Sequence, residues 1–219
     1  MGNKPIVYLI PGLAADRSIF RSIKLPGYET AFIEWEDPLP GEDLIHYAER
    51  FCDHIDSTRP NILIGCSLGG IMAIEMAQFC HPQQLILISS LKNRNEFPWY
   101  LRFFGVFQFY WIIPFSVVKW GVKQIRFLSG AMKKKDMLMI STMLDKTSSR
   151  FFKWAIHQVL HWKGDGGHIK PVHIHGTKDK LFPIRYIKNA IPIKGGNHFM
   201  VVYKGKEISK IILEMLSSN

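Results

Sequence analysis

Ser67 is a lone hydroxyl among small residues, in the stretch LIGCSLGGIMAIEMAQ that joins an apolar run to a helical pattern. Gly65, Gly69 and Gly70 let the chain turn sharply at this point. Such a turn from strand to helix lifts the serine off the sheet, and the helix that begins at Leu68 brings N–H groups and a positive dipole end close to it. A G-x-S-x-G string also arises by chance, but here it follows an apolar strand pattern and precedes a helical one. The pattern therefore predicts that Ser67 is a nucleophile.

A serine hydroxyl needs a general base to attack at neutral pH. The chain has nine histidines, and His173 and His175 lie on or at the end of a predicted strand, so spacing alone does not choose among them. His198, in GGNHFM, follows the last predicted strand and comes after every plausible acid at a strand end. Because serine, acid and histidine follow one another in this order in sheets with such a turn, His198 is the predicted base.

The third member of such a site is an acid that orients the imidazole and stabilises its protonated form. Asp179, in HGTKDKLFP, follows the strand predicted at residues 171–175 and so lies at its carboxyl end. An aspartate in this context also forms turns, and the two roles are compatible. Asp145 and Asp165 are weaker candidates because both belong to a segment without strands.

The negative charge that develops on a substrate oxygen requires two backbone N–H donors. One is predicted at Leu68, directly after the nucleophile. The other is predicted at Leu13, in the loop PGLAA after the first strand, where Gly12 lets the backbone approach closely. The alternative is that this loop is a simple connection between a strand and a helix.

The elements that must position these residues alternate along the chain. Short apolar runs predict strands at residues 4–10, 30–35, 61–66, 85–89, 171–175 and 190–193. Apolar residues at helical spacing predict helices at residues 42–57, 68–79 and 205–216. Continuous apolar strands separated by helices are typical of an α/β fold with a mostly parallel central sheet flanked by helices. Ligands bind outside the carboxyl ends of such strands, where Ser67, Asp179 and His198 are expected.

Residues 91–165 interrupt this alternation because they contain no clear strand. The segment holds 16 of the 28 aromatic residues, and thirteen lysine and arginine residues against four acidic ones, so nearly all of the +10 net charge lies there. The aromatic residues either pack the insertion onto the core or bury an apolar substrate. The basic ones, among them Lys133, Lys134 and Lys135, either solvate its outer face or meet an anionic substrate or membrane. No recognition motif for nucleic acid accompanies the charge, so no such partner is expected.

Other features limit location and cofactors. The apolar stretch at residues 103–118 is shorter than the roughly 20 residues of a membrane-spanning helix, and Pro114 interrupts it, so we interpret it as buried or interfacial. The N-terminus lacks the apolar region and cleavage site of a signal peptide. The three cysteines show neither a pairing pattern nor zinc-binding spacing. We therefore expect free thiols, no structural zinc and a cytoplasmic protein, in peripheral contact with a membrane at most.

The segments IPGLAAD, GCSLGG, HGTKD and GGNHF, in this order, make the chain similar to proteins of the α/β-hydrolase fold. The resemblance covers residues 1–90 and 166–219 and leaves out the insertion. It implies a Ser67–Asp179–His198 triad, an oxyanion hole from Leu13 and Leu68, and a helical cap at residues 91–165. It also implies no metal and no organic cofactor.

The chain departs from the family pattern in two places. Pro11-Gly12 stands where the family usually has His-Gly, so the residues that support the oxyanion loop are expected to differ. The proposed donor, the Leu13 N–H, comes after the glycine and is expected to remain. The family's N-terminal antiparallel strands are not found in the sequence, which predicts a trimmed version of the fold. A serine at position 67 argues against dehalogenases and epoxide hydrolases, because those enzymes need a carboxylate nucleophile.

These features together predict a serine hydrolase that forms an acyl-enzyme. Its expected substrate is an ester or thioester of an apolar acyl compound, either uncharged or anionic. A carbon–carbon bond hydrolase or an acyltransferase would use the same triad. A different class of function is also compatible with the sequence, namely a non-catalytic module of hydrolase fold that docks on anionic membranes through its basic insertion. The sequence does not choose a substrate, a chain length or an oligomeric state.

Overall fold

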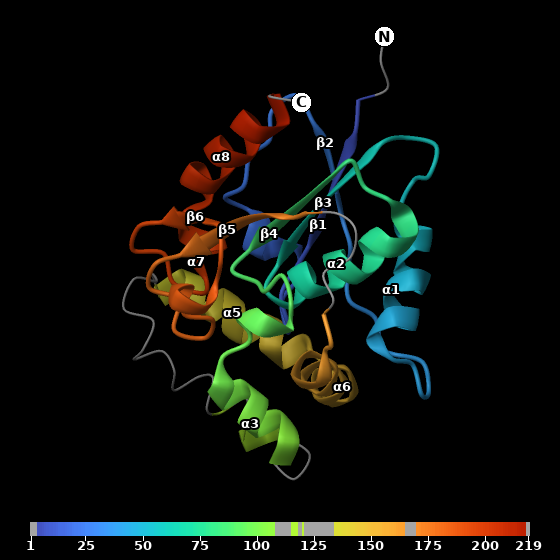
Figure 1. Cartoon of the computed structure of the whole chain (residues 1–219), viewed down its shortest axis with the longest axis vertical. Coiled ribbons are helices and arrows are strands. Elements are labelled where there is room, and N and C mark those ends of the chain that lie inside the picture. The colour runs from blue at the N-terminus through green and yellow to red at the C-terminus, as the bar shows by residue number, and fades with distance from the viewer. Residues whose placement is uncertain (1–3, 108–114, 118–119, 121–133, 165–169, 218–219) are drawn as a thin grey trace.

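The chain folds around a six-stranded sheet in a computed structural model that describes residues 4–107, 115–117, 120, 134–164 and 170–217. The strands lie side by side in the order β2-β1-β3-β4-β5-β6, and every neighbouring pair is parallel. Their bounds are β1 Ile6–Ile10, β2 Glu29–Phe32, β3 Asn61–Cys66, β4 Gln84–Ile88, β5 Val172–Gly176 and β6 Ala190–Ile193. This sheet, flanked by helices, confirms the α/β fold class (Figure 1).

The strand bounds agree with the sequence prediction at β3 and β6 and differ slightly at the others. The largest difference is at β2, which ends at Phe32 and not at residue 35. The Ile33 N–H still bonds to the Leu9 carbonyl, but the chain then leaves the sheet. Trp35 instead reaches the loop after β1, where its indole N–H donates to the Gly12 carbonyl at 2.9 Å.

Helices cover both faces of the sheet, and each face has its own apolar cluster. Helices α1 (Leu44–Phe51) and α2 (Leu68–Cys80) bury residues such as Phe51 and Met72 in the first cluster. Helices α7 (Met200–Tyr203) and α8 (Gly205–Ser217) bury Met200, Ile208 and Ile212 in the second, together with the short 3-10 helix η1 (Arg17–Phe20). Burial on both faces explains the continuous apolar character of the strands.

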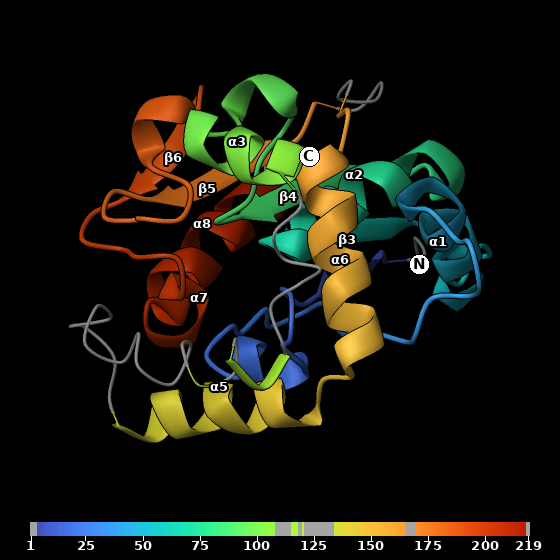
Figure 2. The same cartoon turned by 90° about the horizontal axis from the view of Figure 1, so that it is seen from below.

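Three helices from the segment at residues 91–165 lie across one end of the sheet (Figures 1 and 2). They are α3 (Trp99–Phe107), α5 (Lys134–Lys146) and α6 (Ser149–His161). Each contacts a loop that follows a strand. Tyr100 donates to the Leu181 carbonyl after β5, Arg21 after β1 pairs with Asp136, and Ser148 donates to Asp37 after β2. The described part of the insertion therefore covers the carboxyl end of the sheet.

Two features predicted from the insertion fall partly outside the described residues. Of the apolar stretch at residues 103–118, residues 108–114 and 118 lie outside them, and so does Lys133 of the basic run. Lys135 is exposed at the start of α5. Among the helices of the described ranges, none is both long and apolar enough to cross a membrane.

Candidate active site

Ser67 sits at the junction of β3 and α2, in a backbone conformation that non-glycine residues rarely adopt. Its φ of 54° and ψ of −118° mark a sharp turn between the strand and the helix. The neighbouring glycines make this turn sterically feasible. A Cβ on Gly65 would overlap the Gly69 carbonyl, and a Cβ on Gly69 would overlap the Ile10 carbonyl at the end of β1. The serine therefore stands at the carboxyl end of the central strand.

The three residues proposed from the sequence form a continuous chain of hydrogen bonds. Ser67 Oγ lies 2.9 Å from His198 Nε2, and His198 Nδ1 lies 2.9 Å from Asp179 Oδ2. Because a carboxylate only accepts, His198 donates from Nδ1 and presents a free Nε2 lone pair to the serine hydroxyl. Ser67 is half-buried and the His198 side chain is 14% exposed, whereas Asp179 is buried. The arrangement can take a proton from Ser67 and stabilise it on His198.

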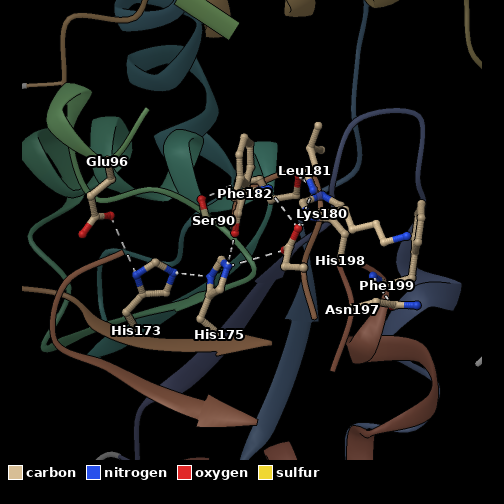
Figure 3. Close-up of polar contacts among 12 residues, drawn as sticks. Ser90, Glu96, His173, His175, Lys180, Leu181, Phe182, Asn197, His198 and Phe199 are labelled. Carbon is tan, nitrogen blue, oxygen red and sulfur yellow. Dashed lines mark hydrogen bonds and ion pairs between the residues drawn. The ribbon is translucent and has the colours of Figure 1, made fainter. Parts of the chain in front are cut away.

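Asp179 is held by the turn that follows β5, in which Leu181 and Phe182 are labelled in Figure 3. Its Oδ1 accepts from the N–H groups of Leu181 and Phe182, both at 2.9 Å, which leaves Oδ2 for His198. Burial by itself raises the pKa of Asp179, but the neighbouring His198 and the Phe182 N–H outweigh it and hold the pKa below its usual value. Asp179 is therefore ionised at neutral pH.

The loops that carry the acid and the base are joined by backbone hydrogen bonds. The Lys178 N–H donates to the Gly196 carbonyl at 2.8 Å, and the Thr177 N–H donates to Ile193 at 3.1 Å. Gly176 ends β5 without a side chain because a Cβ there would overlap Gly196. Asp179 and His198 are consequently close neighbours although they are 19 residues apart in the sequence.

The loop after β1 lies directly against the serine, as the sequence predicted. A Cβ on Gly12 would stand 3.4 Å from Ser67 Cβ and 4.0 Å from its Oγ. The Gly12 carbonyl accepts from the Ala15 N–H and from the Trp35 indole, which fixes the loop. Trp35 thus supports the loop at Gly12, next to the Pro11 departure.

Sequence reasoning missed Ser90, which contacts the turn at Ser67. Ser90 is fully buried and donates from Oγ to the Ser67 carbonyl at 2.6 Å, which braces the turn behind the nucleophile. Cys66, adjacent to Ser67, points into the core, where burial raises the pKa of its thiol to about 12. Cys66 is therefore a neutral thiol at pH 7, whereas the Ser67 hydroxyl faces His198. The SS dipeptide after β4 is the one sequence feature that could have drawn attention to Ser90.

The family profile of the alpha/beta hydrolase family matches residues 5–208, which is most of the chain. The chain belongs to the alpha/beta hydrolase family. The match runs from β1 to α8 and includes the motifs around Ser67, Asp179 and His198. No curated protein matches this chain by sequence.

Solved structures similar to this chain cover nearly its whole length at low sequence identity. A thermophilic esterase from Thermogutta terrifontis is 14% identical over 100% of this chain and 91% of its own, with a TM-score of 0.66. A structure from work on carboxylesterases of Nitrososphaera gargenis is 18% identical over 99% of this chain and 92% of its own, with a TM-score of 0.68. A bromoperoxidase from Bacillus anthracis is 15% identical over 99% of this chain and 93% of its own, with a TM-score of 0.70. These similarities support the fold, and they do not choose among reactions.

The residue types at the site offer acid–base and nucleophilic chemistry. Across the ranges that the structure describes, no group of three or more His, Cys, Asp or Glu side chains is placed to hold a metal ion. The three cysteines are free thiols, as the sequence predicted.

Proposed function

We propose that this protein is a serine hydrolase that cleaves an ester or thioester of an apolar acyl compound. The observation that carries the proposal is the hydrogen-bonded chain from Ser67 through His198 to Asp179, beside the Gly12–Leu13 loop. The neighbours named as esterases are consistent with this class.

In the proposed reaction, Ser67 Oγ attacks the acyl carbon while its proton moves to His198 Nε2. The resulting oxyanion is bound by the N–H groups of Leu13 and Leu68, and Asp179 stabilises the imidazolium. His198 returns the proton to the departing alcohol or thiol, which leaves an acyl-serine. A water then gives a proton to His198 Nε2 and its oxygen to the acyl carbon. Collapse of this second intermediate releases the acid and returns the proton to Ser67.

The proposal is tested by hydrolysis of a panel of p-nitrophenyl and thioester substrates with acyl chains of increasing length. The wild-type chain should turn over members of the panel, and Ser67→Ala should lose turnover while its unfolding transition stays unchanged. Ser149→Ala, at an exposed serine that begins α6, is the matched control and should keep full activity. Equal turnover by Ser67→Ala and the control would refute the assignment of the nucleophile.

The same triad serves carbon–carbon bond hydrolases and acyltransferases, so product analysis has to accompany the assay. Release of free acid from a simple ester, with no transfer to added alcohol, supports ester hydrolysis. Preferential transfer to an alcohol acceptor would move the proposal to acyl transfer.

The free thiols fit our proposal of a cytoplasmic location, because reducing compartments keep cysteines unpaired.

A second function, peripheral docking on an anionic membrane, is favoured by the surface beside Asp179. Within residues 177–194 the one acid is the buried Asp179, while every lysine and arginine is exposed: Lys178, Lys180, Arg185, Lys188 and Lys194. Tyr100 of α3 donates to the Leu181 carbonyl in the same segment, next to an exposed Trp99 and a partly exposed Leu181. We call these residues the basic face. Cations combined with exposed aromatic and aliphatic side chains suit the headgroup region of anionic lipids.

Co-sedimentation with vesicles tests this docking proposal. Binding to vesicles of phosphatidylcholine with phosphatidylserine, but not to phosphatidylcholine alone, is expected at low salt and should weaken as salt screens the charges. The double variant Lys178→Glu/Lys180→Glu should lose the binding. Lys206→Glu, at an exposed lysine of α8 outside this segment, should keep it. No binding at low salt would remove the docking function without affecting the hydrolase proposal.

A further inference from the structure

A buried file of polar side chains continues from the candidate triad into the protein interior (Figure 3). His175 and His173 are two residues apart on β5, so their side chains lie on the same face of the sheet. Both are buried, with exposures of 0% and 1%, and Glu96 beyond them is 2% exposed. None of these three residues takes part in the proposed reaction.

The contacts of His175 determine which of its nitrogens carries the proton. Its Nε2 lies 2.7 Å from the Phe182 carbonyl, which only accepts, so Nε2 donates. The same nitrogen is 3.5 Å from Asp179 Oδ2, the oxygen that binds His198. Burial lowers the pKa of His175, so the ring is neutral and its Nδ1 has no proton. His175 Nδ1 therefore accepts a hydrogen bond.

That bond comes from His173, whose Nε2 lies 3.2 Å from His175 Nδ1. Burial holds the pKa of His173 well below its usual value, so this ring is also neutral, with its proton on Nε2. Its Nδ1 is buried without a hydrogen-bond partner among the described residues and faces Glu96 Oε2 at 4.0 Å. The Glu96 carboxylate is fixed by the N–H groups of Lys92 and Lys188 and by the Lys92 ammonium. This negative charge faces the Nδ1 lone pair of His173 and by itself disfavours the Nε2 tautomer. The closer contact with His175, at 3.2 Å against 4.0 Å, is what favours a proton on Nε2.

Phe182 connects His175 to the Asp179 carboxylate of the triad. Its N–H donates to Asp179 Oδ1, and its carbonyl accepts from His175. Phe182 is therefore held at both its N–H and its carbonyl, and this fixes the turn that binds the Asp179 carboxylate. If the His175 proton moved to Nδ1, the Nε2 lone pair would face both the Phe182 carbonyl and Asp179 Oδ2, and both contacts would become repulsive.

We propose that His175 is a positioning residue for Asp179, and that His173 holds His175 in the tautomer that this role requires. The proposal rests on the hydrolase function proposed above, since it assigns a role relative to the same triad. His175 acts through the turn at Phe182 and touches neither Ser67 nor the position of a substrate.

The first test compares kinetic constants on an activated ester. His175→Leu removes the donor to Phe182, and we expect kcat to fall about 10- to 100-fold, because a small misplacement of a catalytic group has effects of this size. KM should stay unchanged, since His175 is buried away from the substrate. His175→Gln keeps an N–H near the position of Nε2 and should recover most of kcat. His46→Leu, at an exposed histidine of α1, is the control and should leave kcat unchanged.

A second pair of variants keeps the proposal testable if His175→Leu does not fold. His173→Gln retains a donor to His175 Nδ1, whereas His173→Leu removes it. We expect kcat to fall for His173→Leu and to be mostly retained in His173→Gln, with equal unfolding temperatures for the two. A kcat that is equal in His173→Leu, His173→Gln and the wild-type chain would overturn the role assigned to His173.

Nitrogen-15 NMR of the histidine rings separates this proposal from the proposed function, because it needs no turnover. At pH 7 we expect His173 and His175 to be neutral and protonated at Nε2. A wild-type chain with these tautomers but no turnover would remove the hydrolase function while leaving the hydrogen-bonded file intact. A proton at Nδ1 of His175 would overturn the proposal, whatever the activity.

Discussion

At the scale of single residues, the reactivity of Ser67 depends on contacts made by groups far away in the sequence. Its hydroxyl bonds to His198, and its carbonyl is held by Ser90. The side chains that orient His198 in turn depend on N–H groups of the turn after β5. Each contact leaves one atom available for the next. Removal of a single donor or acceptor is therefore expected to disturb the hydrogen bond between the Ser67 hydroxyl and His198.

Asp179→Asn should lower kcat by about four orders of magnitude, because the asparagine amide turns an N–H towards His198 Nδ1 and favours the wrong tautomer. The asparagine oxygen can still accept from Leu181 and Phe182, so the turn should persist. Steady-state kinetics and thermal unfolding of the same preparation check both parts. A loss of folding together with activity would show that Asp179 is needed for the turn and would leave its catalytic role without support.

Cys66 and Cys80 should differ in their reaction with iodoacetamide. Cys66 is buried and its thiol pKa is raised to about 12, whereas Cys80 is half-buried and its contact with Cys52 lowers its pKa. Since the thiolate is the reacting form, Cys80 should be labelled well before Cys66 at pH 7.5. Peptide mass spectrometry over a time course measures the order. Early labelling of Cys66 would mean that the turn at Ser67 is more open than described.

At the scale of elements, the packing of α2 against the end of β1 positions Ser67. The sequence predicted this junction well, because the glycines, the strand pattern and the helical pattern are all local. The bounds of β3 agree for the same reason. The four-residue helix α7 was not predicted, since a segment as short as MVVY shows no helical periodicity. The early end of β2 was also missed, because it depends on the contact between Trp35 and Gly12.

Gly69→Ala and Gly12→Ala should separate the packing of this junction from its chemistry. A methyl group at Gly69 overlaps the carbonyls of Ile10 and Pro11, so unfolding should become easier by about 1–3 kcal/mol. At Gly12 the methyl group finds ordinary contact distances, so stability should change by no more than about 0.5 kcal/mol. Because this methyl group lies against Ser67, kcat/KM should nevertheless fall about tenfold.

Urea unfolding and steady-state kinetics on both variants make this comparison. A Gly12→Ala chain with unchanged kcat/KM would contradict the placement of the oxyanion loop.

The end of α6 is tied to α2 through a buried contact, in which the Trp162 indole donates to Glu75 Oε1 at 2.6 Å. Trp162→Phe should therefore destabilise the protein by about 1–3 kcal/mol, since it leaves an oxygen of the buried Glu75 side chain without this donor. The matched variant Trp154→Phe loses a bond to the neutral Glu42 carbonyl and should cost about 0.5–1.5 kcal/mol. Urea unfolding measures both values. The reverse order of the two effects would contradict the described docking of α6.

At the scale of the whole molecule, the sheet brings together residues that the sequence separates by more than a hundred positions. Chain order and strand ends were enough to choose Ser67, Asp179 and His198. They were not enough to find Glu96 or the role of His175, because a polar contact between distant segments leaves no periodic pattern. The helix bounds within residues 91–165 were not predicted either, since this segment is apolar and aromatic on many sides.

The two strand histidines should make the stability of the whole molecule depend on pH. Burial lowers both pKa values, while an unfolded histidine titrates near 6.5. Below that value the unfolded chain takes up protons that the folded chain does not, so stability should decrease as pH falls below about 6.5. Each histidine contributes at most about 1.4 kcal/mol per pH unit. The charged and titratable groups that face them are Glu96, Asp179, Lys92 and His198.

Thermal unfolding between pH 8 and pH 5 measures this dependence, and His173→Gln should make it less steep. Equal slopes in the variant and the wild-type chain would show that His173 accepts a proton freely in the folded state.

The central claim, that Ser67 is an activated nucleophile, is tested most directly with a fluorophosphonate probe and mass spectrometry of the labelled peptide. The account predicts a single label on Ser67 in the wild-type chain and loss of that label in His198→Ala, with the fold retained in both. An unlabelled Ser67 in a folded chain, or a label that persists after His198→Ala, would contradict it.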